Sequence, residues 1–320
     1  MRNYIIFDLE WNQSPKGKTG RVEHFPFEII EIGAVKLDET FRLHSEFHRL
    51  IRPQVYTQMH SVISEVTRMN MEELQKTGEA FVSVIRDFLE WCGTDYIFCT
   101  WGSMDLMELQ RNMAYYNVDI PWEFPLFYYD IQKLYSLIYG DGKQKSALDV
   151  AVEELRISSD RPFHRALDDA YYTGKVMEAM EMEPVRDYVS VDYYHLPAAE
   201  DQEIYLNFPE YSKYVSRIFS NKEEIMKDRK VTELRCMTCG RSLRKKIRWF
   251  TPNQKIYYAL GNCPEHGLVK GKIRLKKSED GDAFAIKTIK YTDQAGEAEI
   301  RLRQESVRKR RAQKRKLPQK

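Results

Sequence analysis

The sequence predicts an α/β domain with a mixed sheet, followed by a smaller β-rich segment that carries cysteines. Strand patterns come first, strand–helix alternation follows, and the later strand patterns surround cysteines, which together indicate this fold class. Of the 320 residues, 42% are hydrophobic and 12% aromatic, which is typical of a globular chain. No apolar run reaches the ~18–20 residues of a membrane span, so we expect no membrane partner.

The first half supplies the strands and helices of the α/β domain. Three near-adjacent strands predict an antiparallel meander, and a fourth strand lies between amphipathic helices. The expected strands are residues 3–12, 28–37, 41–51 and 95–101. The expected helices are residues 79–92, 104–116, 146–155 and 165–180.

Changes in composition divide the rest of the chain. We expect the α/β domain over residues 1–182 and a helical connector over 183–228. Short strands around cysteines predict a small β-rich domain over 229–292, and a basic tail covers 293–320. The last 20 residues hold ten Lys and Arg and one Glu, which predicts a basic helix or a disordered tail.

Charge is distributed unevenly between the two halves. Residues 1–182 contain 19 Lys and Arg and 29 Asp and Glu, whereas 183–320 contain 31 and 19. A basic half could hold a phosphate backbone, and an acidic half binds a polyanion poorly unless cations sit in it. The N-terminus shows no export signal, so we expect a cytoplasmic protein with reduced thiols.

Two carboxylates stand inside the first predicted strand. Residues i and i+2 of a strand point to the same face, so Asp8 and Glu10 of YIIFDLEWNQ lie together. At that distance they repel each other, and partial burial disfavours both charges. One of them must take up a proton, or both must share a cation.

Two further acids and a histidine fall at the ends of predicted elements. Asp105 lies in CTWGSMDLMEL, and Asp169 lies in PFHRALDDAYY, five residues after His164. Carboxylates suit Mg²⁺ or Mn²⁺, and two such ions can hold the attacking and leaving oxygens of a phosphodiester displacement. With an ordinary pKa of ~6.5, His164 is suited to take the proton of the attacking water.

Three motifs in this order carry a specific resemblance. FDLEWN, WGSMD and HRALDDA resemble the motifs of the DEDDh 3′–5′ exonucleases, a superfamily that includes DnaQ-like proofreading subunits and ribonuclease T. The resemblance covers residues 3–180 and implies a ribonuclease-H-like fold, an α/β mixed five-stranded sheet flanked by helices. Within this superfamily, the sequences FDLEWN and TWG are most similar to those of the KapD-like and histone-mRNA 3′-exonuclease branch.

Carried over by position, the resemblance gives each motif residue a role. Asp8, Glu10, Asp105 and Asp169 would bind two catalytic Mg²⁺ or Mn²⁺ ions, and His164 would be the general base. Singly, each motif also fits a solvated strand edge or a capped helix start. The spacing of five after His164 selects Asp169 over Asp168, and Arg165 stands where the sister class has tyrosine.

Three residues are candidates for substrate contact. Leu9 and Trp11 fit the apolar core by alternation, but the resemblance implies that the residue between the two acids wedges against the terminal base. His60 lies where relatives line the nucleotide pocket. We therefore carry Leu9, Trp11 and His60 as expected substrate-binding residues.

The second half contains a cysteine and histidine pattern of the form C-x₂-C-x₂₃-C-x₂-H. Cys236, Cys239, Cys263 and His266 fit one structural Zn²⁺ in a zinc ribbon, and the alternative is a chance spacing of free thiols. The segment between the two pairs is basic and aromatic. Trp249, Tyr257 and Tyr258 either stack on unpaired bases or form a small aromatic core.

The sequence therefore predicts a two-metal 3′–5′ exonuclease that releases nucleoside 5′-monophosphates. The expected partner is single-stranded nucleic acid, RNA rather than DNA. The alternatives are a DNA exonuclease of proofreading or repair and a non-catalytic nucleic-acid-binding regulator with the same fold. The oligomeric state and the end structure of the substrate stay open.

Overall fold

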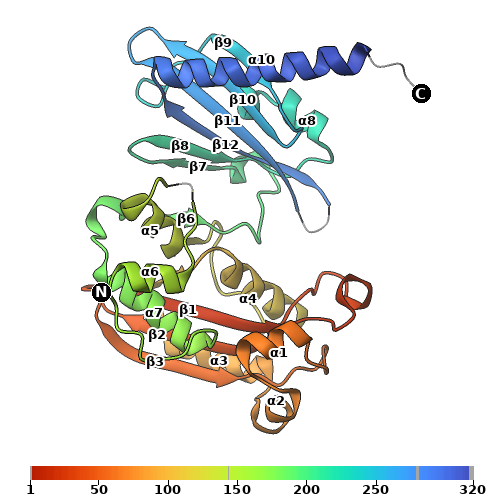
Figure 1. Ribbon diagram of the computed structural model, residues 1–320, viewed down its shortest axis with the longest axis vertical. Coiled ribbons are helices and arrows are strands. Elements are labelled where there is room, and N and C mark those ends of the chain that lie inside the picture. The colour runs from red at the N-terminus through yellow and green to blue at the C-terminus, as the bar shows by residue number, and fades with distance from the viewer. Residues whose placement is uncertain (1, 143, 279–280, 317–320) are drawn as a thin grey trace. The chain divides into compact units, whose positions relative to one another are not determined.

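The computed structural model describes residues 2–142, 144–278 and 281–316. The chain divides into two compact units, residues 1–195 (unit 1) and 196–320 (unit 2) (Figure 1). Within the described ranges, no helix is both long enough and apolar enough to cross a lipid bilayer.

Unit 1 is built on a six-stranded mixed sheet in the order β3-β2-β1-β4-β5-β6. The central strand β1 pairs antiparallel with β2 and parallel with β4, and β4 continues parallel to β5. This confirms the α/β mixed sheet with a ribonuclease-H-like arrangement; the sheet has one strand more than the expected five. The sixth strand contains only two residues. The strands are β1 (Asn3–Asn12), β2 (Glu28–Leu37), β3 (Leu43–Leu50), β4 (Tyr96–Thr100), β5 (Phe127–Asp130) and β6 (Ser190–Val191).

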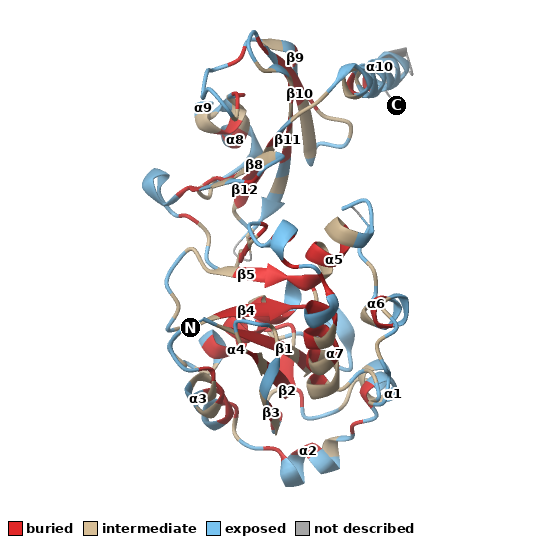
Figure 2. Cartoon of the chain, turned by 90° about the vertical axis from the view of Figure 1, so that its left-hand side faces the viewer, coloured by how far each residue is buried: buried red, intermediate tan, exposed pale blue. Residues whose placement is uncertain are grey.

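Helices cover both faces of this sheet (Figure 2). Phe7 and Leu9 of β1 face a core formed with the apolar sides of α3 and α4. The opposite face of β1 and β2 contacts α7. The helices of unit 1 are α1 (Ser61–Thr67), α2 (Met71–Thr77), α3 (Phe81–Cys92), α4 (Met104–Tyr115), α5 (Ile131–Tyr139), α6 (Leu148–Glu154) and α7 (Ala166–Ala179), with short 3₁₀ turns at Gly17–Gly20 and Glu183–Val185.

One glycine determines how closely α7 approaches the sheet. Gly33 of β2 pairs with Asp8 of β1, and a Cβ atom placed on Gly33 would lie 1.9 Å from the backbone nitrogen of Leu167. The same atom would lie 2.2 Å from the carbonyl carbon of Ala166. Only glycine therefore lets the first turn of α7 rest on the strand pair that carries Asp8.

The sequence did not predict α1, α2, β5 or α5. The stretch FYYDIQKLYSLIY contains a four-residue strand that passes directly into a helix. Asp130 ends the strand and caps the helix, because its side chain accepts a hydrogen bond from the Lys133 amide at 3.0 Å. An apolar run without an intervening turn signal hid this boundary.

Unit 2 contains a second six-stranded sheet, in the order β7-β8-β12-β11-β10-β9. Its strands are β7 (Ile204–Asn207), β8 (Tyr211–Val215), β9 (Lys245–Phe250), β10 (Ile256–Cys263), β11 (Gly267–Lys277) and β12 (Ala283–Tyr291). Its helices are α8 (Lys222–Lys227), α9 (Arg229–Thr232) and α10 (Gln294–Lys316), with a 3₁₀ turn at Glu200–Gln202. The unit is larger than the predicted ribbon because β7 and β8 extend the sheet.

One sequence expectation needs correction here, and of the two forms expected for the basic tail the helix is observed. The expected helical connector, residues 183–228, holds strands β6, β7 and β8 besides α8, and it is shared between the two units. Alternating apolar residues such as Ile204 and Leu206 are part of a sheet there, because β8 pairs with β12. The basic tail forms α10, whose Ile300 and Val307 pack with Ile247 and Leu260 of the sheet. Residues 317–320 of the expected tail lie outside the described residues.

We expect Gly33→Ala to destabilise unit 1 by roughly 1–3 kcal/mol, because the added methyl must displace the backbone of α7. The matched control is Gly174→Ala within α7, whose Cβ would meet only side-chain ends, Val35 Cγ2 at 3.1 Å and the Leu37 methyl carbons at 3.8 and 3.9 Å. Gly174→Ala also gains helix propensity, so its effect should be near zero. Chemical denaturation of both variants measures the difference, and equal stabilities would contradict the proposed contact.

Candidate active site

Asp8 and Glu10 lie on the face of β1 that is turned toward α7. Their neighbours Phe7 and Leu9 are buried on the other face, as alternation predicts. Asp8 and Glu10 are partly exposed. In register, Asp8 pairs with Gly33 and Glu10 pairs with Glu31 of β2.

The first turn of α7 brings Asp169 to the same place. Ligand oxygens of Asp8, Glu10 and Asp169 lie within 4.8 Å of one another. Asp169 Oδ2 accepts a hydrogen bond from the His164 amide at 3.1 Å, whereas Oδ1 is buried and has no hydrogen-bond partner among the described residues. His164 itself is exposed and adopts a left-handed backbone conformation with φ of 68°. Its backbone thus folds around the Asp169 carboxylate.

Asp105 enters the site from the turn that follows β4. Since β1 and β4 are parallel and Ile6 pairs with Cys99, the turn after Thr100 lies level with Asp8. The Leu9 amide donates to Asp105 Oδ1 at 3.3 Å. Asp105 is buried at the start of α4, where the positive end of the helix favours a negative charge. We refer to Asp8, Glu10, Asp105 and Asp169 as the carboxylate cluster.

Every member of the carboxylate cluster resists ionisation in the absence of a cation. Burial, together with the charges of the neighbouring acids, raises the pKa of Asp8 well above its usual range. The same causes raise the pKa of Glu10 to about 8. Burial, opposed by backbone hydrogen bonds, raises the pKa of Asp105 to about 7 and that of Asp169 to about 6. A bound cation would favour the ionised form of all four carboxylates and so lower their pKa values.

The donor set fits a hard divalent cation. It consists of carboxylate oxygens, which Mg²⁺ and Mn²⁺ prefer over nitrogen or sulfur. Asp169 Oδ1 is buried without a hydrogen-bond partner among the described residues. A buried oxygen of this kind is unfavourable unless it is bound. The residues present therefore fit metal ions at this position.

A buried salt bridge beside the cluster fixes the start of α7. Glu31 is fully buried and accepts hydrogen bonds from Arg165 Nη2 at 2.8 Å and from the Ala166 amide at 3.3 Å. Its Oε1 also lies 2.7 Å from Nε2 of His48. Although burial raises the pKa of Glu31, these partners hold it below its ordinary value. Glu31 thus positions the segment that carries His164 and Asp169.

The sequence reasoning missed Glu31, although a signal existed. EIIEIGAVKL places two glutamates next to apolar residues of a strand, and both Glu28 and Glu31 prove to be buried. Glu28 accepts the backbone amides of Gln54, Val55 and Tyr56. Charged residues are almost never fully buried unless paired, so their occurrence in a core strand could have indicated this role.

His60 lies at the edge of the site rather than within the cluster. Buried Asn12, at the end of β1, donates to the carbonyls of Tyr56 and Gln58, both at 2.9 Å. Its Oδ1 accepts from the His60 amide at 3.0 Å. The ring atom Nδ1 of His60 is buried and has no hydrogen-bond partner among the described residues. Asn12 therefore ties the segment that carries His60 to the strand of Asp8 and Glu10.

Leu9 and Trp11 pack in the core, on the side away from the cluster. Leu9 is 3% exposed. Trp11 is partly buried against the same core, and its ring centroid lies 5.5 Å from that of Phe27. The Leu9 side chain thus points into the core, and the expected contact of Leu9 with a terminal base stays a prediction. Leu9 contributes to the site through its amide, because alternation turns its side chain inward.

Asp168 lies close to Asp169 but has different partners. Its Oδ1 lies 3.7 Å from Arg161 Nη1, and Asp168 is absent from the group of ligand oxygens that includes Asp169. The placement agrees with the choice of Asp169 from the motif spacing.

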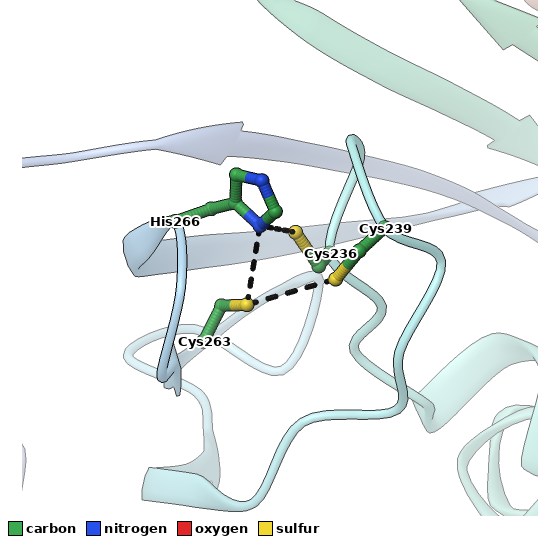
Figure 3. A group of neighbouring side chains, drawn as sticks. All are labelled: Cys236, Cys239, Cys263 and His266. Carbon is green, nitrogen blue, oxygen red and sulfur yellow. Dashed lines mark hydrogen bonds between the residues drawn. The ribbon is translucent and has the colours of Figure 1, made fainter.

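Unit 2 brings its cysteine and histidine residues together in a second candidate site (Figure 3). Nδ1 of His266 lies 3.5 Å from the sulfurs of both Cys236 and Cys263, and the sulfurs of Cys239 and Cys263 are 3.7 Å apart. All four ligand atoms lie within 4.8 Å of one another. Gly240 and Gly267 follow the two pairs with φ of 67° and 83°, conformations that glycine allows in tight turns.

These distances match the edges of a zinc tetrahedron. Zn–S and Zn–N distances of about 2.3 and 2.0 Å place sulfur atoms about 3.8 Å apart and sulfur about 3.5 Å from nitrogen. Although burial raises the pKa of Cys236, hydrogen bonds from the Cys239 and Thr238 amides and from Tyr291 lower it to about 6. Cys236 is therefore favoured as a thiolate near neutral pH, whereas for Cys239 the hydrogen bond from the Arg241 amide is outweighed by desolvation and the neighbouring sulfurs, which raise its pKa.

The aromatic residues between the two pairs belong mainly to the core of unit 2. Trp249 packs into two apolar clusters and donates its Nε1 hydrogen to the Thr232 carbonyl at 2.7 Å. Tyr257 packs in the second of these clusters. Of the two alternatives from the sequence, an aromatic core describes these two residues.

Comparisons with known proteins match the region of the carboxylate cluster. The family model described as "Exonuclease" matches residues 5–177. The chain is 28% identical over 182 residues to a probable 3′-5′ exonuclease, KapD, of Bacillus subtilis, which covers 56% of this chain and 84% of that protein. It is 28% identical over 180 residues to a putative bifunctional exonuclease/endonuclease of Mycobacterium tuberculosis, covering 55% of this chain and 26% of that protein. One similar solved structure is the nuclease domain of 3′hExo, a DEDDh family member, bound to rAMP. The two chains are 22% identical with a TM-score of 0.48, and the match covers 60% of this chain and 96% of that chain.

Without added divalent ions, we expect the stability of unit 1 to fall as pH rises from about 4 to 8. The pKa values of Glu10, Asp105 and Asp169 are higher in the folded chain than in an unfolded one, so the folded chain holds more protons in this window. Added Mg²⁺ should raise the melting temperature more at pH 8 than at pH 5. About 1 kcal/mol corresponds to a shift of roughly 2–4 °C.

Thermal unfolding with and without Mg²⁺ measures the effect, with KCl of equal ionic strength as the control. Asp8→Asn should flatten the pH dependence, because it removes one carboxyl with a raised pKa and its charge beside Glu10. A metal-free stability that rises with pH over this window would contradict the account.

Proposed function

Because the chain belongs to the Exonuclease family, we propose that it is a DEDDh-type 3′–5′ exonuclease whose carboxylate cluster removes nucleotides from single-stranded RNA with the help of two divalent ions. The products would be nucleoside 5′-monophosphates. The observation that carries the proposal is the convergence of Asp8, Glu10 and Asp169 from β1 and α7 to within 4.8 Å, with Asp105 hydrogen-bonded beside them.

The four carboxylates would hold Mg²⁺ or Mn²⁺ ions. When bound, such ions activate a water molecule and stabilise charge on the attacking and leaving oxygens. The protein fixes the ligands by separate means: the β1–β4 register places Asp105, and Gly33 together with Glu31 places Asp169. The carboxylates are thereby held in position before a substrate arrives.

His164 is proposed as the general base. Its amide binds the Asp169 carboxylate, while its exposed ring forms no hydrogen bond with another described residue. An exposed imidazole beside the ligands can take a proton from water near neutral pH. His60, held by Asn12 next to β1, is proposed to contact the terminal nucleotide.

The proposed preference for RNA rests on the amino-acid sequences of two motifs. FDLEWN and TWG resemble the histone-mRNA 3′-exonuclease branch, and no residue described above recognises a 2′-hydroxyl. Degradation of matched RNA and DNA oligonucleotides, single-stranded and duplex, with either the 3′ or the 5′ end blocked, decides between RNA and DNA and fixes the polarity. Degradation from a free 5′ end with the 3′ end blocked would refute the proposed direction.

We further propose that Cys236, Cys239, Cys263 and His266 bind one structural Zn²⁺. The four protein ligands complete a tetrahedron, so no position remains for a reacting water. The ion would join the turn after α9 to the turn between β10 and β11 and stabilise a sheet that has only small apolar clusters on this side.

Asp8→Asn and Asp169→Asn should each abolish divalent-dependent hydrolysis, because each removes a charge that the metal ions require. His164→Ala should lower the rate by a factor on the order of 10²–10⁴. The matched control is Asp168→Asn, which changes an adjacent carboxylate that faces Arg161 and should retain activity. The assay measures release of nucleoside monophosphates with Mn²⁺ or Mg²⁺, and a fully active Asp169→Asn chain would refute the assignment.

Metal analysis of the purified chain should find about one zinc per molecule. Cys239→Ser should lose this zinc, because sulfur supplies one of the four ligands. Cys92→Ala is the control, since Cys92 is buried in the core of unit 1 and should not affect the zinc content. A wild-type chain that folds with no zinc would reject the site.

A further inference from the structure

One face of the sheet in unit 2 carries a row of positive charge. On β11, Val269 and Ile273 point into the apolar clusters beneath α8, α9 and the zinc-ligand turns. By alternation, Lys270, Lys272 and Arg274 share the opposite face. The sequence analysis expected the basic half as a whole to hold a phosphate backbone and did not single out β11.

Neighbouring elements add cations to the same face. Lys290 of β12 pairs in register with Lys270 of β11. Arg303 of α10 donates to the hydroxyl of Tyr258 at 3.1 Å, and Tyr258 pairs in register with Lys272. We call Lys270, Lys272, Arg274, Lys290 and Arg303 the cationic face.

The charges of the cationic face act on one another. The pKa of Lys272 is lowered first by partial burial and then by the positive charges of Arg274, Arg303, Lys290 and Lys270. Arg303 has an acidic partner, Glu299, at 2.6 Å. For Lys272, Arg274 and Lys290, no acidic side chain of the described residues forms a salt bridge. Such uncompensated repulsion is relieved when an anionic partner binds.

The spacing of the row points to the kind of anion. Alternate residues of a strand repeat every ~6.6–6.8 Å, which is close to the separation of successive phosphates in an extended single strand. On β11 and β12 no large apolar side chain of the described residues is exposed, whereas a membrane-binding surface inserts apolar groups. Unit 2 as a whole contains 30 Lys and Arg against 16 Asp and Glu.

We infer that the cationic face binds the phosphodiester backbone of single-stranded nucleic acid and so adds affinity for long substrates that the carboxylate cluster does not provide. The inference rests on the proposed function for the identity of the polyanion. It assigns unit 2 a role in holding the strand rather than in cleaving it.

The test compares two double variants in the full-length chain that also carries Asp8→Asn, so that the bound strand is not degraded. Lys272→Gln with Arg274→Gln neutralises the cationic face. Lys222→Gln with Lys227→Gln makes the same charge change on α8, which covers the other face of the sheet. Binding of a fluorescent 20-nucleotide single strand is measured over a range of salt concentrations, without added divalent ions.

Neutralising the cationic face should weaken binding several-fold and reduce the slope of log K against log salt by about 1.4, which corresponds to two phosphate contacts at ~0.7 each. The α8 variant should retain the wild-type slope. An unchanged slope, or an equal loss in both variants, would overturn the inference. Unaltered oligonucleotide binding combined with lost binding to polyglutamate or to anionic vesicles would also overturn it.

Hydrolysis assays with long and short substrates distinguish a failure of this inference from a failure of the proposed function. In chains that retain Asp8, neutralising the cationic face should lower kcat/KM for a long oligonucleotide and leave a dinucleotide substrate unaffected. Equal losses on both substrates would contradict a role in holding the strand. Failure of the parent chain to hydrolyse either substrate would refute the proposed function, while the binding measurement would still decide the role of the face.

Discussion

The repulsion among four carboxylates is the constraint on which the structure of unit 1 depends. Burial, together with the charges of neighbouring acids, raises the pKa of every member of the cluster, so the folded chain holds them together against an electrostatic penalty. Three features hold the acids in place against this penalty. They are the register of β1 with β4, the absence of a side chain at Gly33, and the hydrogen bonds to Asp105 and Asp169. A fold shaped only for stability would place a lysine or arginine among these acids. The positions here favour ions that come from solution.

Two kinds of buried acid can be distinguished in the same sheet. Glu31 stands opposite Glu10 in register, yet its pKa is lowered, because His48, Arg165 and the Ala166 amide satisfy it. Glu10 has a raised pKa because of burial and the charges of Asp169, Glu31 and Asp105, which outweigh the lowering effect of Arg165. Arg165 donates its hydrogen bonds to Glu31 and fixes the start of α7. Removing one partner of such a buried pair leaves an uncompensated charge, which is strongly destabilising.

The sequence could predict those parts of the fold and the site that local pattern determines. Strands β1, β2 and β4 and helices α3, α4 and α7 follow from periodicity, and the confirmed family follows from three motifs in a fixed order. Residues whose role depends on tertiary partners could not be assigned: Glu31 reaches Arg165 across 134 positions, and Asn12 reaches His60 across 48. For Leu9, alternation correctly predicted a side chain in the core, whereas the substrate contact implied by family analogy stays a prediction. The cationic face was missed because it requires the pairing of β11 with β12 and the position of α10.

The separation of charge between the two units follows from the same electrostatics. Unit 1 contains 20 Lys and Arg against 32 Asp and Glu, so its long-range field repels a polyanion. Divalent ions neutralise that field only around the carboxylate cluster, where the scissile phosphate would lie. Cations placed among the cluster would attract the strand, but they would compete with the metal ions for the same carboxylates. A separate sheet, which carries Lys272 and Arg274 on the face that it shares with α10, would supply affinity for phosphates without that competition. The basic unit would therefore supply the affinity for long strands that an acidic, metal-dependent site does not provide.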